Sequence, residues 1–180
     1  MSKTIYLPDN YYKKQEITNE RYTVRVIIEN KEGLYGYIKI YGEDIFGFRD
    51  HIESCGGGIE EGETDNDAII REVREELGCT CEIFTFLGQI IHDFHILKRR
   101  TYANYYYVKV IEENLDTSLT ELETKLFKDI IWMNLEDIKQ ILKKDTSDVG
   151  KLVHERELLG IQLYEDYLQN NKGENYEYNS

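Results

Sequence analysis

The chain has 180 residues, of which 41% are apolar and 32% are charged. That apolar fraction supplies a hydrophobic core, which excludes a chain disordered throughout, and the length fits one domain, which we expect over residues 1–170. Twenty-two Lys and Arg against 35 Asp and Glu give a net charge of −13. A charge of this sign repels the phosphates of DNA or RNA, so we expect no polymeric nucleic acid as a partner.

No apolar run reaches the roughly 18–20 residues that cross a bilayer, and the first residues lack the apolar core of an export signal. We therefore expect a cytoplasmic protein without membrane contact. Three cysteines are an odd number, which fits a reducing compartment better than a disulfide framework. The spacing of Cys79, Cys81, His92 and His95 is not a usual zinc pattern, so we expect the cysteines to behave as small buried apolar residues.

Alternating apolar residues predict the first strands, and a glycine-rich loop follows them. Residues 21–29 and 34–41 predict two strands joined as a hairpin by the turn at 30–33. A short stretch at 45–48 leads to the loop at 55–63. The next helix is predicted over 64–77 and ends at Gly78, because glycine best tolerates a left-handed cap.

The second half of the sequence predicts further strands and two more helices. The strands lie at 82–91, 102–111 and 129–133, with a polar connection at 114–125. The helices lie at 135–143 and about 147–169, and residues 171–180 form a flexible tail. An apolar stripe on the last helix packs either on its own domain or on a second subunit, which leaves a homodimer possible.

The helix at 64–77 carries three acidic residues on one face. At 100° per residue, Glu72, Glu75 and Glu76 fall within an arc of about 100°. Like charges one turn apart weaken a helix, and anions near its C-terminus oppose the macrodipole. Mg²⁺ or Mn²⁺ would remove the conflict, because these ions prefer hard oxygen ligands. The alternative is a solvated acidic face, and the three glutamates alone do not decide between the two.

The glycine-rich loop before this helix favours a metal or phosphate site. Its glycines allow tight turns and a close approach to a ligand, and they leave main-chain carbonyls available as metal ligands. The spacing from Gly57 to Gly62 also fits a Walker loop. However, the next residue is Glu63 where that motif needs a lysine, so a Walker loop is excluded.

Together, the loop and the helix resemble the Nudix box of the MutT/Nudix hydrolases. The match runs Gly57-x5-Glu63-x7-Arg71-Glu72-Val73-x-Glu75-Glu76-x-Gly78. Cys79 departs from the pattern, since the family usually has a bulky aliphatic residue there. The order of strands and helices around the box, which spans about 56–78, is similar to the family's α/β/α sandwich with a mixed sheet.

The resemblance implies hydrolysis of a phosphoanhydride bond in a nucleoside diphosphate linked to a group X. Such substrates include nucleoside triphosphates, sugar nucleotides and dinucleotides. The resemblance also implies Mg²⁺ or Mn²⁺ as cofactor, held by Glu72, Glu75, Glu76 and the carbonyl of Gly57. Glu75 is further expected to take part in catalysis. Glu63 and Arg71 match a pair that ties the loop to the helix and orients the catalytic carboxylates.

A general base outside the box is expected on a later loop. The candidates are Glu112, Glu113, Glu121 and Glu123, of which we favour Glu123 because it lies shortly before the strand that enters Trp132. Tyr22, Tyr37, Phe48 and Tyr107 are candidates for stacking on a base. Arg49, His51 and residues 98–100 are candidates for phosphate contact, and His92 and His95 for acid–base chemistry. The alternative function is a non-catalytic nucleotide sensor or interaction module on the same fold.

Overall fold

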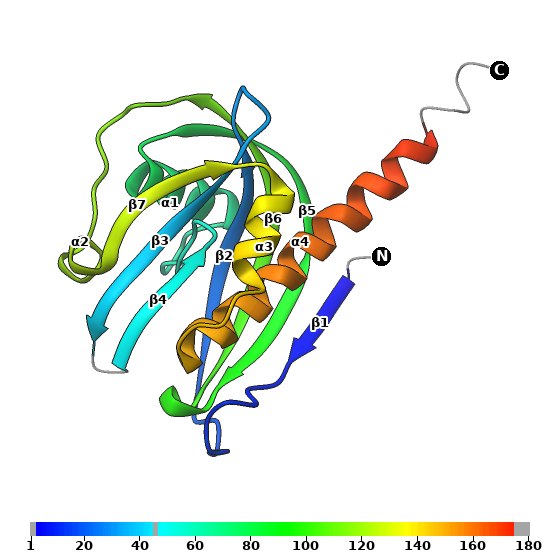
Figure 1. Cartoon of the computed structure of the whole chain (residues 1–180). Coiled ribbons are helices and arrows are strands. Elements are labelled where there is room, and N and C mark those ends of the chain that lie inside the picture. Colours follow the sequence, from blue (N-terminus) through cyan, green and yellow to red (C-terminus); the bar gives the residue numbers. More distant parts are fainter. Residues whose placement is uncertain (1–2, 45–46, 175–180) are drawn as a thin grey trace.

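The computed structural model describes residues 3–44 and 47–174, with the backbone alone for 172–174. Figure 1 shows the strands and helices along the chain. The strands are β1 (Lys3–Leu7), β2 (Asn19–Glu29), β3 (Tyr35–Asp44), β4 (Gly47–Glu53), β5 (Thr80–Phe94), β6 (Arg99–Glu112) and β7 (Phe127–Met133). The helices are α1 (Asp65–Leu77), the 3₁₀ turn η1 (His95–Leu97), α2 (Glu121–Leu126), α3 (Leu135–Leu142) and α4 (Asp148–Glu174).

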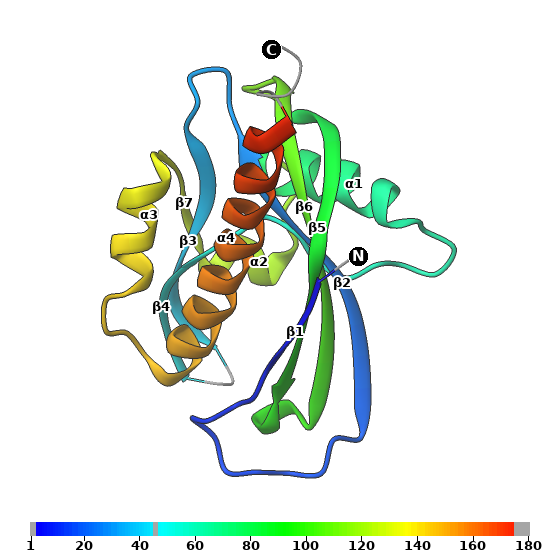
Figure 2. The ribbon, with the colours of Figure 1, turned by 90° about the vertical axis from the view of Figure 1, so that its right-hand side faces the viewer.

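In the described part of the chain, the strands form one mixed sheet in the order β1-β5-β6-β2-β3-β4. Strand β7 stands outside this order and also pairs with β3. The β1–β5 and β2–β6 pairs are parallel, and the remaining pairs are antiparallel. Helix α1 covers one face of the sheet, and α3 and α4 lie on the other (Figure 2). This arrangement confirms the predicted α/β/α sandwich.

Each face of the sheet has its own apolar cluster. Val24 and Val26 of β2 pack with Ile69 of α1, whereas Ile27 packs with Leu152 of α4. Successive side chains of a strand point to opposite faces. Arg21 and Arg25 therefore lie on the same face of β2 as Ile27, which is the face covered by α4.

The sheet opens between β2 and β4. Among the described residues, β2 pairs with β3 at the single position Glu29–Tyr35, and the two groups of strands diverge from there (Figure 1). The segment after β4 fills the opening: Val26 N donates to Cys55 O, and Val24 N donates to Gly57 O, both at 3.0 Å. The glycine-rich loop is therefore held between the two halves of the sheet.

Most of the predicted strands and helices are confirmed, with ends shifted by a few residues. The predicted hairpin corresponds to β2 and β3, and Gly78 ends α1 with a left-handed φ of 60°. The predicted stretch at 45–48 is β4 from Gly47 onward, and residues 45–46 lie outside the described residues. The apolar stripe of the last helix packs within its own chain, with Leu152, Leu163 and Tyr164 in the core under α4.

Two predictions about local structure need correction, and one strand is missed. The connection at 114–125 contains the start of α2, whose first turn is closed by a capping box between Thr120 and Glu123. The sequence does not predict strand β1, since its apolar signal is short and its stability comes from pairing with β5. Residues 171–174 continue α4 and are not tail. The rest of the predicted tail, 175–180, lies outside the described residues.

Cys55 and Cys79 are buried in the cluster under α1, and Cys81 packs against it, which confirms the prediction that the cysteines act as apolar side chains. Among the described helices, none combines the length and apolarity needed to span a membrane.

Candidate active site

The sequence at both ends of α1 determines where this helix lies. Thr64 Oγ1 accepts a hydrogen bond from Asp67 N at 3.2 Å, and Asp67 Oδ2 accepts one from Thr64 N at 3.1 Å. This reciprocal capping box satisfies backbone N–H groups that have no partner inside the helix. The start and the end of the helix are therefore both set by local residues, which fixes the orientation of its acidic face.

Arg71 of α1 joins the helix to the glycine-rich loop. Its Nε and Nη2 donate to the two carboxylate oxygens of Glu63 at 2.8 and 2.9 Å, and Nη2 also donates to Gly58 O at 3.0 Å. The hydrogen bonds from Arg71, with one from Glu60 N, lower the pKa of Glu63 to about 2. The pair is therefore charged at any physiological pH, and it ties three points of the loop to the helix.

The three predicted metal-binding glutamates lie on one face of α1 but in different environments. Glu72 is buried and accepts from Arg71 Nη1 at 2.7 Å, while Glu75 is more exposed and lies 3.3 Å from the same nitrogen. Glu76 is buried and accepts from Gly56 N at 2.9 Å. Burial raises the pKa of Glu72, and it raises the pKa of Glu76 to about 8 despite the nearby Arg25. Two carboxylates are thus held where a negative charge is poorly solvated.

The glycines of the loop allow the backbone to pass close to these carboxylates. A Cβ built on Gly57 would overlap Glu72 Oε1, and one built on Gly56 would overlap the carbonyl of Val24. Gly56 also has a φ of 139°, which side chains rarely allow. The carbonyl of Gly57 accepts from Val24 N, so it is directed at β2. Among the described groups of the loop, the N–H of Gly56 is the one that donates a hydrogen bond to a glutamate of α1.

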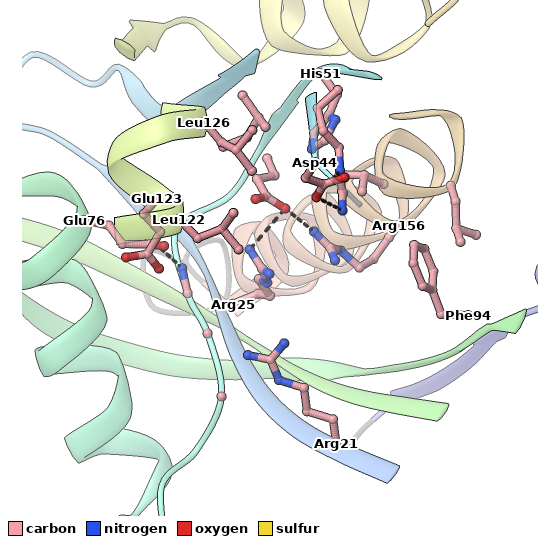
Figure 3. Close-up of a pocket in the computed structure, with 18 of the residues that line it drawn as sticks. Arg21, Arg25, Asp44, His51, Glu76, Phe94, Leu122, Glu123, Leu126 and Arg156 are labelled. Carbon is pink, nitrogen blue, oxygen red and sulfur yellow. Dashed lines mark hydrogen bonds and ion pairs between the residues drawn. The ribbon is translucent and has the colours of Figure 1, made fainter. Parts of the chain in front are cut away.

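Two cavities adjoin the acidic face of α1. The first, which we call the arginine cavity, has a volume of about 440 Å³ and lies in the opening between the two halves of the sheet (Figure 3). Its walls come from α1, α2, α4, the loop and the six strands β2 to β7. It is lined by Glu72 and Glu76 at the helix and, among the described arginines, by Arg21, Arg25, Arg49, Arg99 and Arg156.

The second cavity, which we call the glutamate cavity, has a volume of about 560 Å³ and lies beside Arg71, Glu72 and Glu75. The two cavities share Arg21, Gly58, Glu72 and Glu123. Glu123 is therefore the one general-base candidate among the four described that lines a cavity. Its carboxylate also accepts from Thr120 N at 2.7 Å, as part of the capping box of α2.

Two of the cavity arginines belong to a buried ion-pair network. Arg156 of α4 donates to Glu53 at 3.2 Å and to Glu157 at 2.5 Å, and Arg25 lies 3.6 Å from Glu53 (Figure 3). Burial alone would raise the pKa of Glu53, but Arg25, His51 and Arg156 lower it to about 2. Arg49 pairs with Asp44 at 2.8 Å. These pairs fix the guanidinium groups along the cavity wall.

The sequence identifies some of these residues and misses others. Arg49, His51, His92 and Arg99 are candidates from the sequence, and all four line the arginine cavity. Arg21, Arg25 and Arg156 are missed. A signal exists for the first two: they alternate along a predicted strand whose opposite face is apolar, a pattern usually interpreted as a solvent-facing edge. Arg156 lies at a buried position of an amphipathic helix, where no local pattern distinguishes it.

The other candidate residues from the sequence lie outside both cavities. Of the described residues, none of the four aromatic candidates lines either cavity: Tyr22, Tyr37, Phe48 and Tyr107. Arg100 pairs with Asp93 at 2.7 Å outside the cavities, and His95 Nδ1 accepts from Gln15 N at 3.3 Å. In the part of the chain that the structure describes, no three His, Cys, Asp or Glu side chains are gathered closely enough to hold a metal ion as they stand.

The donor set on α1 nevertheless suits a hard divalent cation. Its donor atoms are carboxylate oxygens, which such cations prefer. Within the described residues, Glu76 has no cationic side chain hydrogen-bonded to it. Glu72 and Glu75 share one cationic partner, the nitrogen Nη1 of Arg71. An ion between them would relieve both the burial cost and the mutual repulsion that these carboxylates carry.

Comparison with known proteins agrees with this geometry. The sequence model of the NUDIX domain matches residues 20–155. Over 91 residues the chain is 32% identical to the nucleoside triphosphatase NudI of Enterobacter sp. (strain 638), a match that covers 48% of this chain and 63% of that protein.

Solved structures share the fold at lower identity. A NUDIX hydrolase from Nitrosomonas europaea superposes with a TM-score of 0.62 at 18% identity, covering 83% of this chain and 89% of the other. A MutT protein from Methanosarcina mazei Go1 gives a TM-score of 0.58 at 18% identity, covering 89% and 99%. The segment that the family model matches contains the whole loop–helix motif, the Arg71–Glu63 pair and the residues that line both cavities, except Arg156. The chain belongs to the NUDIX family.

Proposed function

We propose that this protein is a metal-dependent pyrophosphohydrolase that cleaves a phosphoanhydride bond in a nucleoside diphosphate linked to a group X. The observation that carries the proposal is the acidic face of α1, where buried Glu72 and Glu76 have raised pKa values next to a loop tied down by Arg71 and Glu63. Carboxylates in such surroundings cost stability, and a cation with a polyphosphate would offset that cost. The NudI relative, named a nucleoside triphosphatase, supports the same reaction class.

In this proposal, Glu72, Glu75 and Glu76 hold Mg²⁺ or Mn²⁺, and the carbonyl of Gly57 contributes its second lone pair. When bound, the ion supplies neutralisation of the phosphate charge and a lower pKa for a nearby water. Arg71 Nη1 contacts Glu72 and Glu75, whereas Nε and Nη2 of the same arginine bind Glu63 and hold the loop in place beside these carboxylates.

The reaction adds water across the P–O–P bridge. The water oxygen bonds to one phosphorus, the bridging oxygen leaves with the other, and a proton passes to a carboxylate. We assign that carboxylate to Glu123, which lines both cavities, and Glu75 is a second carboxylate that lines the glutamate cavity. Arg21, at the junction of the cavities, would contact a phosphate oxygen as the charge develops.

Product analysis over a panel of substrates tests the function. Nucleoside triphosphates, sugar nucleotides and dinucleoside polyphosphates are incubated with and without Mg²⁺, and the products are separated by anion-exchange chromatography. We expect turnover that EDTA abolishes, and a loss of several orders of magnitude in Glu75→Gln. Glu61→Gln, an exposed carboxylate of the same loop outside both cavities, is the matched control. Binding without turnover of any member would favour the sensor function instead.

A further inference from the structure

The arginine cavity is lined by five described arginines, and three of them have ion-pair partners. Arg25, Arg49 and Arg156 face Glu53, Asp44 and Glu157. Among the described residues, the side chains of Arg21 and Arg99 make no hydrogen bond or ion pair with a protein group. The Nε of Arg99 is buried without a partner. Two guanidinium groups without a hydrogen bond or ion pair on one cavity wall contribute nothing evident to the stability of the fold.

Burial makes these cations unfavourable as they stand. Burial, with Arg21 and Arg156 nearby, lowers the pKa of Arg99 to about 10. An anion in the cavity would restore the electrostatic balance, because a guanidinium group recovers most of its lost solvation from a bidentate oxyanion.

His92 on the neighbouring strand offers a further donor. It is 6% exposed, it lines the cavity, and within the described residues neither of its ring nitrogens has a hydrogen-bond partner. Burial and the adjacent Arg156, Arg25 and Arg99 hold its pKa well below the usual range, so the ring is neutral at pH 7. A neutral imidazole still has one N–H that can donate a hydrogen bond. Buried polar groups without a hydrogen-bond partner are rare in native proteins.

The unpaired groups come from three adjacent strands, Arg21 from β2, Arg99 from β6 and His92 from β5. Arg21 lines both cavities, and a Cβ built on Gly58 would lie 3.2 Å from its Nη2. Arg99 pairs with Asn19, two residues along β2 from Arg21. The backbone positions of the two arginines are therefore offset by about 7 Å along the strands. This offset is of the order that separates two phosphates on one ribose.

We propose that the arginine cavity binds a phosphate monoester that the substrate carries away from its scissile diphosphate. The preferred substrates are then diphosphate-linked nucleotides with an additional phosphate, and Arg99 and His92 are the residues that recognise it. The inference rests on the proposed function for the place of the scissile diphosphate, beside Glu72 and Arg21. A phosphate monoester carries a charge of about −1.5 to −2 at pH 7 and three acceptor oxygens, so it can accept hydrogen bonds from both the guanidinium group of Arg99 and the N–H of His92.

Binding without metal tests the site independently of catalysis. In EDTA, the affinities of adenosine 3′,5′-bisphosphate and AMP are compared by isothermal titration calorimetry. We expect the bisphosphate to bind at least tenfold more tightly, since charge-assisted hydrogen bonds are worth that much. Arg99→Gln should reduce the ratio below about threefold. Arg100→Gln, the exposed neighbour paired with Asp93, should keep it. Equal wild-type affinities, no binding of either compound, or an undiminished ratio in Arg99→Gln would overturn the proposal.

Turnover separates this inference from the function on which it rests. With Mg²⁺, kcat/KM is measured for NADPH against NADH and for coenzyme A against dephospho-coenzyme A, which differ by one phosphate within each pair. A preference for the phosphorylated member of either pair that Arg99→Gln removes supports the inference. Equal kcat/KM within both pairs overturns it while the hydrolase function stands. If no diphosphate in any panel is cut, the hydrolase function fails, and the calorimetry still decides what the cavity binds.

Discussion

Arg71 and Glu63 form a two-point ion pair, Nε to Oε1 at 2.8 Å and Nη2 to Oε2 at 2.9 Å. The two residues are eight positions apart, one on α1 and one on the loop, and Arg71 Nη2 also donates to Gly58 O, which joins the glycines to the same arginine. Parallel hydrogen bonds fix orientation as well as distance. The position of Gly56–Gly58 relative to the glutamates therefore depends on the planar fork of this one arginine.

Arg71→Lys tests that dependence. Lysine keeps the charge but has no planar fork, so it cannot bind both oxygens of Glu63 and the carbonyl of Gly58 at once. We expect kcat/KM to fall roughly ten- to a hundredfold, as for other residues that orient metal ligands, with little change in far-UV circular dichroism. Arg74→Lys is the matched control, because Arg74 bonds to Asp116 O outside both cavities. Wild-type kinetics in Arg71→Lys would contradict the positioning role.

The raised pKa of Glu76 predicts how stability depends on pH without metal. The folded-state pKa of about 8 lies above the value of 4.5 expected for the unfolded chain. Between these values the folded state binds a proton that the unfolded state has lost, so the free energy of unfolding falls as the pH rises from 4.5 to 8. The loss is roughly 1.4 kcal/mol for each pH unit crossed in that window.

Glu76→Gln removes this titration, so in EDTA its thermal unfolding midpoint relative to wild type should rise as the pH rises toward 8. At pH 4 the difference should be smallest, since Glu76 is protonated there in both states. Glu61→Gln should follow the wild type at every pH. A constant offset between Glu76→Gln and wild type across the range would show that burial does not hold a proton on this carboxylate.

Substitutions at two adjacent glycines should separate function from folding. In Gly57→Ala, the new methyl group meets the flexible carboxylate of Glu72, which can move aside. We expect a large loss of turnover and a small change in the unfolding midpoint. In Gly56→Ala, the methyl group meets the backbone of Val24 at a φ of 139°, so the fold itself is strained.

Urea unfolding should therefore show a cost above about 1 kcal/mol in Gly56→Ala. Gly62→Ala is the control for backbone strain alone, because no heavy atom lies within 4 Å of the position of its new Cβ at a φ of 81°. If Gly57→Ala loses stability as much as Gly56→Ala does, the close approach of the loop to Glu72 serves folding and not the site.

Glu123 and Glu121 provide a test of the general base. They lie two residues apart in α2, yet Glu123 lines both cavities and Glu121 is exposed outside them. Glu123→Gln should lower kcat by roughly 10²–10⁴-fold, the usual contribution of a general base. A glutamine oxygen can still accept from Thr120 N, so α2 is retained. Equal kinetics in Glu123→Gln and Glu121→Gln would assign the proton to another group.

Residues 57–78 show how much a local segment can specify. The cap at Thr64, the apolar stripe with Ile69 and Val73, and the stop at Gly78 all act within a few residues of one another, so periodicity and cap chemistry predict α1 correctly. The same locality holds for the pair between Glu63 and Arg71, because one short motif spans both the loop and the helix. Strand β1, by contrast, depends on β5, more than 80 residues later, and no local pattern predicts it.

The arginine cavity is decided by tertiary structure alone. Arg21, Arg99 and Arg156 are far apart in the chain and meet because β2 pairs in parallel with β6 and α4 covers the same face. Which face of a strand points inward depends on register, and register is set by partners distant in sequence. The sequence by itself therefore determined the motif, its acidic helix and the family it resembles. Only the folded chain decided where positive charge accumulates beside that helix, because short-range preferences shape single elements whereas cavities form between elements.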